Sequence, residues 1–466
     1  MQRFVSKYAL AAHLALLSVA PLILFPFCGQ REIAISLLWL SFAGVLWFLM
    51  EPSRRSTEML YDARIRVCML VLVDPLFWLL VLLAVFAAIR MFNGGVQECY
   101  DVELGKWIVT EPSVSIFPGH AEGSGFLEFA VVVSMFPVLM GCRHALGKSA
   151  RLSFLSTMSI LAGVALLAFL AAARLGIGSA AKLLDAGIWP PSYIGCGFGF
   201  CFIGGIVAFA GSFECKWNKL LLLFALGIGL DAAGLFFFAP FHVVLLFAAV
   251  AVLLFLFSAV YLWVACHPAD ALKFVAGLII AAVVPVAISL TLVQKEVLDS
   301  HLAFFNGGGM FPDGFWELRM RLSELSHSVW RGGIWLGTGL GSFPGQVRLL
   351  ASEADWTAWN GVLPQAPFCG WWMLLCERGI IGAATIALPL AFLLFTFVRR
   401  LVGAIGVRAF LPMSALGILA VVALAAESFV DASFLRPEIL LSAGAFLALS
   451  GSSFPKKEAQ DGESNG

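Results

Sequence analysis

Long apolar runs alternate with short polar segments along almost the whole chain of 466 residues. Twelve runs each have about 20 residues, the length that an α-helix needs to cross the hydrocarbon core of a bilayer. Because a helix satisfies its own backbone hydrogen bonds in lipid, the pattern predicts an all-α, polytopic bundle of about twelve transmembrane helices. The predicted spans cover residues 8–28, 33–50, 68–90, 125–142, 152–173, 193–211, 220–238, 242–265, 274–293, 375–398, 407–426 and 434–452.

Composition supports a membrane protein. Hydrophobic residues make up 61% of the chain and charged residues only 12%, whereas about half of an ordinary soluble domain is apolar. The first run is longer than the core of a signal peptide, so we interpret it as a retained helix. A net charge of zero gives no indication of a nucleic-acid partner. No Cys or His cluster has the spacing of a zinc site, and we expect neither a metal nor a cofactor.

Positive charge marks alternate short loops, and such loops lie on the cytoplasmic side of a membrane. Arg54, Arg143, Lys216 and Arg399 follow the second, fourth, sixth and tenth spans. This bias predicts that both termini are cytoplasmic, and that the long polar segment after the ninth span is outside. The predicted organisation is helices 1–9 in residues 1–293, an external loop with the candidate site in 294–374, helices 10–12 in 375–452 and a disordered cytoplasmic tail in 453–466.

The external loop combines arginine with tryptophan. Guanidinium groups bind phosphate and pyrophosphate, and tryptophan offers a flat face to sugars or lipid headgroups. The arginines that we expect to bind such a substrate are Arg319, Arg321, Arg331 and Arg348. Helical spacing brings Arg321 and Arg331 to one face together with His327. The alternative is an amphipathic helix over 316–330 that rests on the bilayer, with its arginines reaching back to water.

Glycines alternate with Thr338 and Leu340 in residues 337–341. No βαβ unit surrounds this run, which excludes a dinucleotide-binding fingerprint. The glycines therefore indicate either a tight turn at the membrane surface or backbone amides that approach an anion.

Few charged residues lie within the predicted spans: Asp74, Glu128, Asp231 and the pair Glu377 and Arg378. An ionised group inside a bilayer is costly, so these side chains are not expected to face lipid. Asp231 is nearest the middle of a span, and we expect it in the bundle interior, either protonated or near an arginine. Glu377 and Arg378 could instead be interfacial. In an alternative reading, the protein is a transporter or flippase of a lipid-linked or amphipathic solute, with Asp231, Glu128 and Asp74 along its path.

Three segments resemble the O-antigen ligase and O-antigen polymerase family of bacterial membrane glycan transferases. They are GTGLGSF at 337–343, WWMLLCERGIIG at 371–382 and DASFLRP at 431–437. The resemblance implies transfer of a glycan from an undecaprenyl-pyrophosphate carrier to an acceptor glycan or lipid, at the periplasmic face of the inner membrane. It also implies that arginines, here Arg319 or Arg321, hold the pyrophosphate while a base activates the acceptor hydroxyl.

The chain departs from the family pattern at the expected base. The family has a histidine nine residues before the glutamate that corresponds to Glu377, and Phe368 stands at that position here. A phenylalanine ring cannot accept a proton. His327 is the nearest substitute, and its alternative is an ordinary interfacial histidine. A diverged enzyme and a non-catalytic envelope scaffold are both compatible with this departure.

Overall fold

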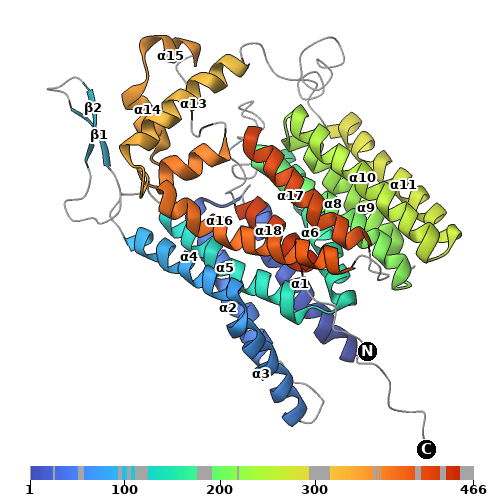
Figure 1. Cartoon of the computed structure of the whole chain (residues 1–466). Helices are drawn as coiled ribbons and strands as arrows, with labels where there is room; N and C mark the ends of the chain where they lie inside the picture. Colours follow the sequence, from blue (N-terminus) through green and yellow to red (C-terminus); the bar gives the residue numbers. More distant parts are fainter. Residues whose placement is uncertain are drawn as a thin grey trace, which may run out of the picture.

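The computed structural model shows a bundle of α-helices with one small hairpin of strands (Figure 1). The predicted tail (453–466), the first part of the predicted loop (294–314) and Phe368 lie outside the residues that the structure describes. The described residues are 2–24, 27–50, 57–92, 97–101, 106–110, 124–175, 192–217, 220–292, 315–359, 364, 367, 369–404, 411–430 and 437–451.

Each predicted span overlaps a helix of the structure, which confirms the predicted all-α, polytopic membrane fold. Over the described residues, eight helices are long and apolar enough to cross a membrane, and the apolar parts of three others are shorter. The twelve helices that correspond to the predicted spans are α1 (Gln2–Leu24), α2 (Gln30–Met50), α4 (Pro75–Phe92), α5 (Ser124–Met140), α6 (Lys148–Arg174), α8 (Ser192–Glu214), α9 (Leu221–Phe238), α10 (Phe241–Ala265), α11 (Pro268–Leu292), α16 (Gly370–Ala404), α17 (Leu411–Val430) and α18 (Pro437–Gly451); α11 is in neither of these two groups.

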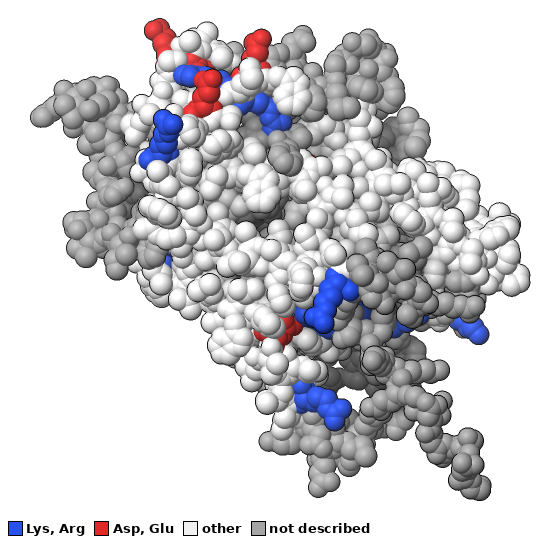
Figure 2. Space-filling model, in the orientation of Figure 1, with Lys and Arg blue, Asp and Glu red and all other residues white. Residues whose placement is uncertain are grey.

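Charged side chains separate into two zones on the face shown in Figure 2. One zone covers the helices of the predicted external loop, and the other lies toward the opposite end of the bundle. The described surface between the zones is a belt of uncharged residues. A belt of this kind suits the hydrocarbon core of a bilayer, where ionised groups are costly.

Helix α8 is the most enclosed helix of the bundle and packs against α6, α9, α10 and α18. Small residues let its neighbours approach closely, as is usual between membrane helices. A Cβ at Gly199 would lie 2.7 Å from the Phe247 ring, and one at Gly204 would lie 2.8 Å from the Phe446 ring. Both rings also contact Phe200 edge to face. The core therefore depends on aromatic rings that fit against glycines.

The third predicted span, 68–90, is wrong in its bounds because the chain breaks at Asp74. Helix α3 (Thr57–Val73) ends before it and α4 begins at Pro75. Asp74 Oδ1 accepts a hydrogen bond from the backbone N–H of Leu76 at 3.1 Å. Aspartate is favoured as an N-cap, and proline suits the first helical position because it needs no N–H partner there. Asp74 thus starts a spanning helix instead of lying inside one.

Asp74 also joins three helices at the end of the bundle opposite the loop. Its Oδ2 lies 2.5 Å from Arg143 Nε and 2.7 Å from His144 Nε2. Both partners belong to η1 (Gly141–Ala145), a π-helical turn directly after α5. Arg143 Nη1 donates a further hydrogen bond to Thr396 Oγ1 of α16 at 3.2 Å. We call Asp74, Arg143, His144 and Thr396 the Asp74 cluster; it ties together α4, α5 and α16.

The predicted external loop is largely helical where the structure describes it. It contains α13 (Phe315–Gly332), α14 (Phe343–Leu350) and α15 (Glu353–Ala358). The segment between the third and fourth predicted spans holds an antiparallel hairpin of β1 (Gln97–Asp101) and β2 (Lys106–Thr110), which the sequence pattern did not predict. A second apolar core joins α13 and α14 to α16. Its buried members are Leu322, Leu325, Val329, Phe343, Val347, Trp359 and Cys376.

Candidate functional site

Helix α16 is interrupted at Gly379, near its loop end. Gly379 has φ 63° and ψ −171°, a backbone conformation that only glycine adopts readily. The interruption leaves carbonyl groups before it and N–H groups after it without partners inside the helix. Such groups need partners elsewhere when they are buried. The predicted span 375–398 is therefore wrong in its bounds. The helix begins at Gly370, and Glu377 and Arg378 lie just before the break.

Residues 333–341 supply the missing partners. This segment, which ends in the glycine turn of residues 337–341, runs alongside the interruption and exchanges hydrogen bonds with it on both sides. The four backbone hydrogen bonds are Thr338 N–H to Cys376 O (2.7 Å), Gly339 N–H to Glu377 O (3.2 Å), Ile380 N–H to Ile334 O (3.0 Å) and Ile381 N–H to Trp335 O (3.1 Å). The loop is therefore joined to the transmembrane helix by main-chain bonds, which hold its position closely.

Two glycines are required where these segments cross. Gly337 has φ 75°, and a Cβ there would lie 2.4 Å from the carbonyl carbon of Glu377. A Cβ at Gly379 would lie 2.4 Å from the carbonyl of Trp335. Both distances involve backbone atoms, which cannot move aside as a side-chain end can. The structure shows a tight turn here. One of its amides also contacts an acidic side chain of the protein itself: Gly341 N–H donates to Glu377 Oε1 at 2.9 Å.

Four charged side chains lie beside the interruption, and we call them the charge cluster: the buried Arg90 of α4, Glu377 and Arg378 of α16, and the partly buried Glu128 of α5. Arg90 is 1% exposed and Glu377 is 2% exposed. Arg378 Nε lies 2.7 Å from Glu128 Oε1. Arg90 Nη2 donates to the main-chain oxygen of Glu377 at 2.8 Å. The cluster thus connects α4, α5 and α16 at the loop end, and neither member of the Glu377 and Arg378 pair is exposed at an interface.

The charge cluster keeps unused hydrogen-bonding capacity. Among the described residues, Arg90 Nη1, Arg378 Nη1 and Glu128 Oε2 are buried without a hydrogen-bond partner. A buried polar group without a partner carries a desolvation cost of about 1–3 kcal/mol, and more when it is charged. Two guanidinium nitrogens and one carboxylate oxygen of the cluster therefore remain available for further hydrogen bonds.

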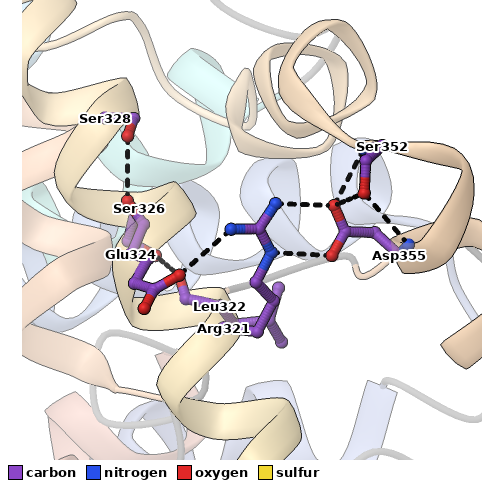
Figure 3. A network of polar contacts seen from close by, with 7 residues as sticks. All are labelled: Arg321, Leu322, Glu324, Ser326, Ser328, Ser352 and Asp355. Carbon is purple, nitrogen blue, oxygen red and sulfur yellow. Dashed lines mark hydrogen bonds and ion pairs between the residues drawn. The ribbon is translucent and has the colours of Figure 1, made fainter.

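Arg321, predicted to bind substrate, is held by carboxylates of its own loop (Figure 3). Its Nε and Nη2 donate to Asp355 at 2.7 and 2.9 Å, and its Nη1 donates to Glu324 at 3.0 Å. Ser352 and Asp355 form a capping box at the start of α15. The hydrogen bond from Arg321 holds the pKa of Asp355 well below its usual range, and the same contact raises the pKa of Arg321. This fork joins α13 to α15.

The other residues predicted in the loop occupy separate positions on it. Arg331 is exposed in the last turn of α13, while Arg319 on α13 and Arg348 on α14 are half-buried. His327 is half-buried, and its ring centroid lies 5.9 Å from that of Trp330 and 5.9 Å from that of Trp372. His327 therefore packs where α13 meets α16.

Asp231 lies in the bundle interior, as predicted, and is fully buried. Its partner is Ser159 of α6, whose hydroxyl donates to Asp231 Oδ2 at 2.5 Å; of the two expectations from the sequence, a protonated carboxyl group or a nearby arginine, no contact with an arginine is described. Asp231 and Glu128 thus have different partners in different parts of the bundle. The structure does not join them into one polar path through contacts between their side chains.

Arg90 is the site residue that the sequence analysis missed. It ends the predicted third span, where an arginine commonly reaches back to the membrane surface. Its position seven residues after Leu83 on α4 was the available signal, because Leu80, Leu83, Ala87 and Arg90 all share the buried face of this helix.

Comparisons with known proteins add no assignment to this geometry. Among the described residues, no group of three or more His, Cys, Asp and Glu side chains is arranged to hold a metal ion. No protein-family model matches the sequence, and the search of curated proteins finds no match.

Proposed function

We propose that this protein is a glycan ligase or polymerase of the bacterial cell envelope. Its donor is an undecaprenyl-pyrophosphate-linked glycan, its acceptor is a second glycan or a lipid, and it works at the periplasmic face of the inner membrane. The proposal is supported above all by the charge cluster, in which Arg90 Nη1 and Arg378 Nη1 have no acceptor among the described residues. The sequence resemblance in residues 337–343 and 371–382 supports the same reaction.

The chemistry requires an anion site at the depth of a lipid headgroup. As the acceptor oxygen attacks the anomeric carbon, the bond from that carbon to the pyrophosphate oxygen breaks and the carrier pyrophosphate leaves with its electron pair. Guanidinium groups stabilise the charge that develops on this leaving group. In our proposal this role belongs to Arg90 and Arg378, since the fork of Arg321 is occupied by Asp355 and Glu324.

The acceptor hydroxyl must lose its proton to a base. Glu128 Oε2 is a buried carboxylate oxygen without a partner among the described residues, next to the proposed anion site. His327 is the second candidate because it lies in the loop that is joined to α16. Replacing each by glutamine distinguishes them: wild-type turnover falls at low pH as the base becomes protonated, so loss of the base removes this pH dependence and lowers turnover most where the base is deprotonated.

The test compares Arg90→Gln and Arg378→Gln with the control Arg399→Gln, an exposed arginine toward the other end of α16. Cells that produce each variant at wild-type level are assayed for surface glycan and for carrier-linked intermediates. We expect the two cluster variants to lose the glycan product and accumulate the carrier-linked donor, while the control resembles wild type. Normal product and donor levels in both cluster variants would exclude the proposed role. A folded protein without any transfer activity would favour the scaffold reading.

The transporter reading receives less support from the geometry. It places Asp231, Glu128 and Asp74 along one route. Each carboxylate instead has separate partners: Ser159 for Asp231, Arg378 for Glu128, and Arg143 with His144 for Asp74. Movement of a labelled lipid-linked donor across proteoliposome membranes, without any transfer, would favour the transporter over the enzyme.

A further inference from the structure

A buried carboxyl group lies far from the charge cluster in sequence and has a different environment. Asp231 occupies the middle part of α9 and has no exposed surface. The hydroxyl of Ser159 on α6 donates to its Oδ2 at 2.5 Å, whereas Oδ1 has no hydrogen-bond partner among the described residues. The carboxyl group thus has one neutral donor and one unused oxygen.

The surrounding helices contribute no compensating charge among the contacts that the structure describes. Ser159 is the contact from α6, and the thiol of Cys201 is the titratable neighbour from α8. Where α11 packs against α9 at Gly229, the nearest α11 atoms are the main-chain oxygen of Ala281 and the side chain of Val284, so α11 brings no charged side chain to that point. An ionised aspartate at the centre of a membrane helix costs about 2.5–3.5 kcal/mol on insertion scales, and a single serine does not offset that cost.

The backbone is shaped to admit Ser159. A Cβ at Gly205 of α8 would lie 2.8 Å from Ser159 Oγ, and a Cβ at Gly227 of α9 would lie 3.3 Å from it. Two glycines on two helices therefore leave room for the one hydroxyl group that reaches Asp231. This arrangement is a built contact between α6 and α9, and it does not depend on the proposed transfer reaction.

We propose that Asp231 is a proton-binding site: its carboxyl group keeps a proton inside the membrane and joins α9 to α6 as a neutral acid. Ser159 donates to Oδ2, so the proton resides on Oδ1. The site differs from the charge cluster, where carboxylates are matched by guanidinium groups. A neutral acid also explains how α9 inserts without a counter-ion.

The test is infrared spectroscopy of the purified protein. A protonated carboxyl group gives a C=O stretching band that is separate from the amide and carboxylate bands and shifts in deuterium oxide. We expect Asp231→Asn to lose this band and the control Asp270→Asn, a partly exposed aspartate paired with Lys273, to retain it. We further expect the band to persist throughout the neutral pH range. A wild-type spectrum without the band, or a band that converts to carboxylate in that range, would overturn the proposal.

A second variant keeps the test decisive if Asp231→Asn fails to fold. Ser159→Ala removes only the hydroxyl, and it should move the C=O band to higher frequency because the hydrogen bond to Oδ2 is lost. The band should remain present, since the proton does not come from Ser159. If Ser159→Ala leaves the band unmoved, the protonated group is elsewhere and the assignment to Asp231 is refuted.

Discussion

Replacing Gly379 by alanine tests whether the interruption of α16 sets the position of the loop. The alanine would occupy a backbone conformation that costs about 1–3 kcal/mol for a residue with a side chain. Its Cβ would also lie 2.4 Å from Trp335 backbone atoms, so the segments have to separate. Separation breaks the hydrogen bonds from Ile380 and Ile381 to the loop, each worth about 0.5–1.5 kcal/mol. Together these effects amount to about 2–6 kcal/mol.

This loss is a large share of the stability of a typical domain, about 5–15 kcal/mol. We therefore expect Gly379→Ala to lower the unfolding midpoint in detergent and to increase protease cleavage within residues 315–359. Gly332→Ala is the matched control: Gly332 ends α13, and a Cβ there meets nothing within 4 Å. If Gly379→Ala and the control have the same unfolding midpoint and the same protease cleavage, the loop is not held by the interruption and our reasoning about this junction is wrong.

Three further predictions concern ion pairs at opposite ends of the bundle. Arg321→Ala should destabilise the loop helices by about 1 kcal/mol, as expected for a half-exposed pair, whereas Arg331→Ala should not; equal protease resistance would contradict this. Folding lowers the pKa of Asp355. The stability contributed by its ion pair is therefore complete above the unfolded pKa of about 3.9, and it is lost as pH falls toward the lower folded pKa. Loop protection measured by hydrogen exchange should consequently persist at mildly acidic pH. Asp74→Asn removes the charge that pairs with Arg143 and should cost about 2 kcal/mol in the unfolding free energy; an unchanged midpoint would show that this pair contributes no stability.

The membrane fold could be predicted from the sequence because one physical requirement dominates it. A helix must be apolar for about 20 residues to span a bilayer, and that requirement is visible in a single run of sequence. Even the error at Asp74 has a local explanation. An Asp-Pro pair inside an apolar run is a start signal for a helix, and hydropathy alone does not register it.

The candidate site could be predicted only in part, because its partners come from distant parts of the chain. The sequence analysis selected Glu128 and Arg378 separately from the cost of charge in lipid, but their contact joins residues 250 positions apart. Arg90 was not predicted as a site residue because an arginine at the end of an apolar run has the same sequence pattern whether its side chain reaches the membrane surface or the bundle interior. Arg321 was assigned to substrate because nothing near it in sequence shows that Asp355, 34 residues later, takes two of its donors.

Contacts of charged side chains connect α4, α5 and α16 at both ends of these helices. The Asp74 cluster binds the three helices at one end, and the pairs made by Arg90 and Arg378 bind them at the other. A slide by a single helical turn, about 5.4 Å, would break contacts at both ends together. We therefore expect α4, α5 and α16 to move as one rigid unit. Any movement that admits or releases a bulky molecule then involves the other helices of the bundle.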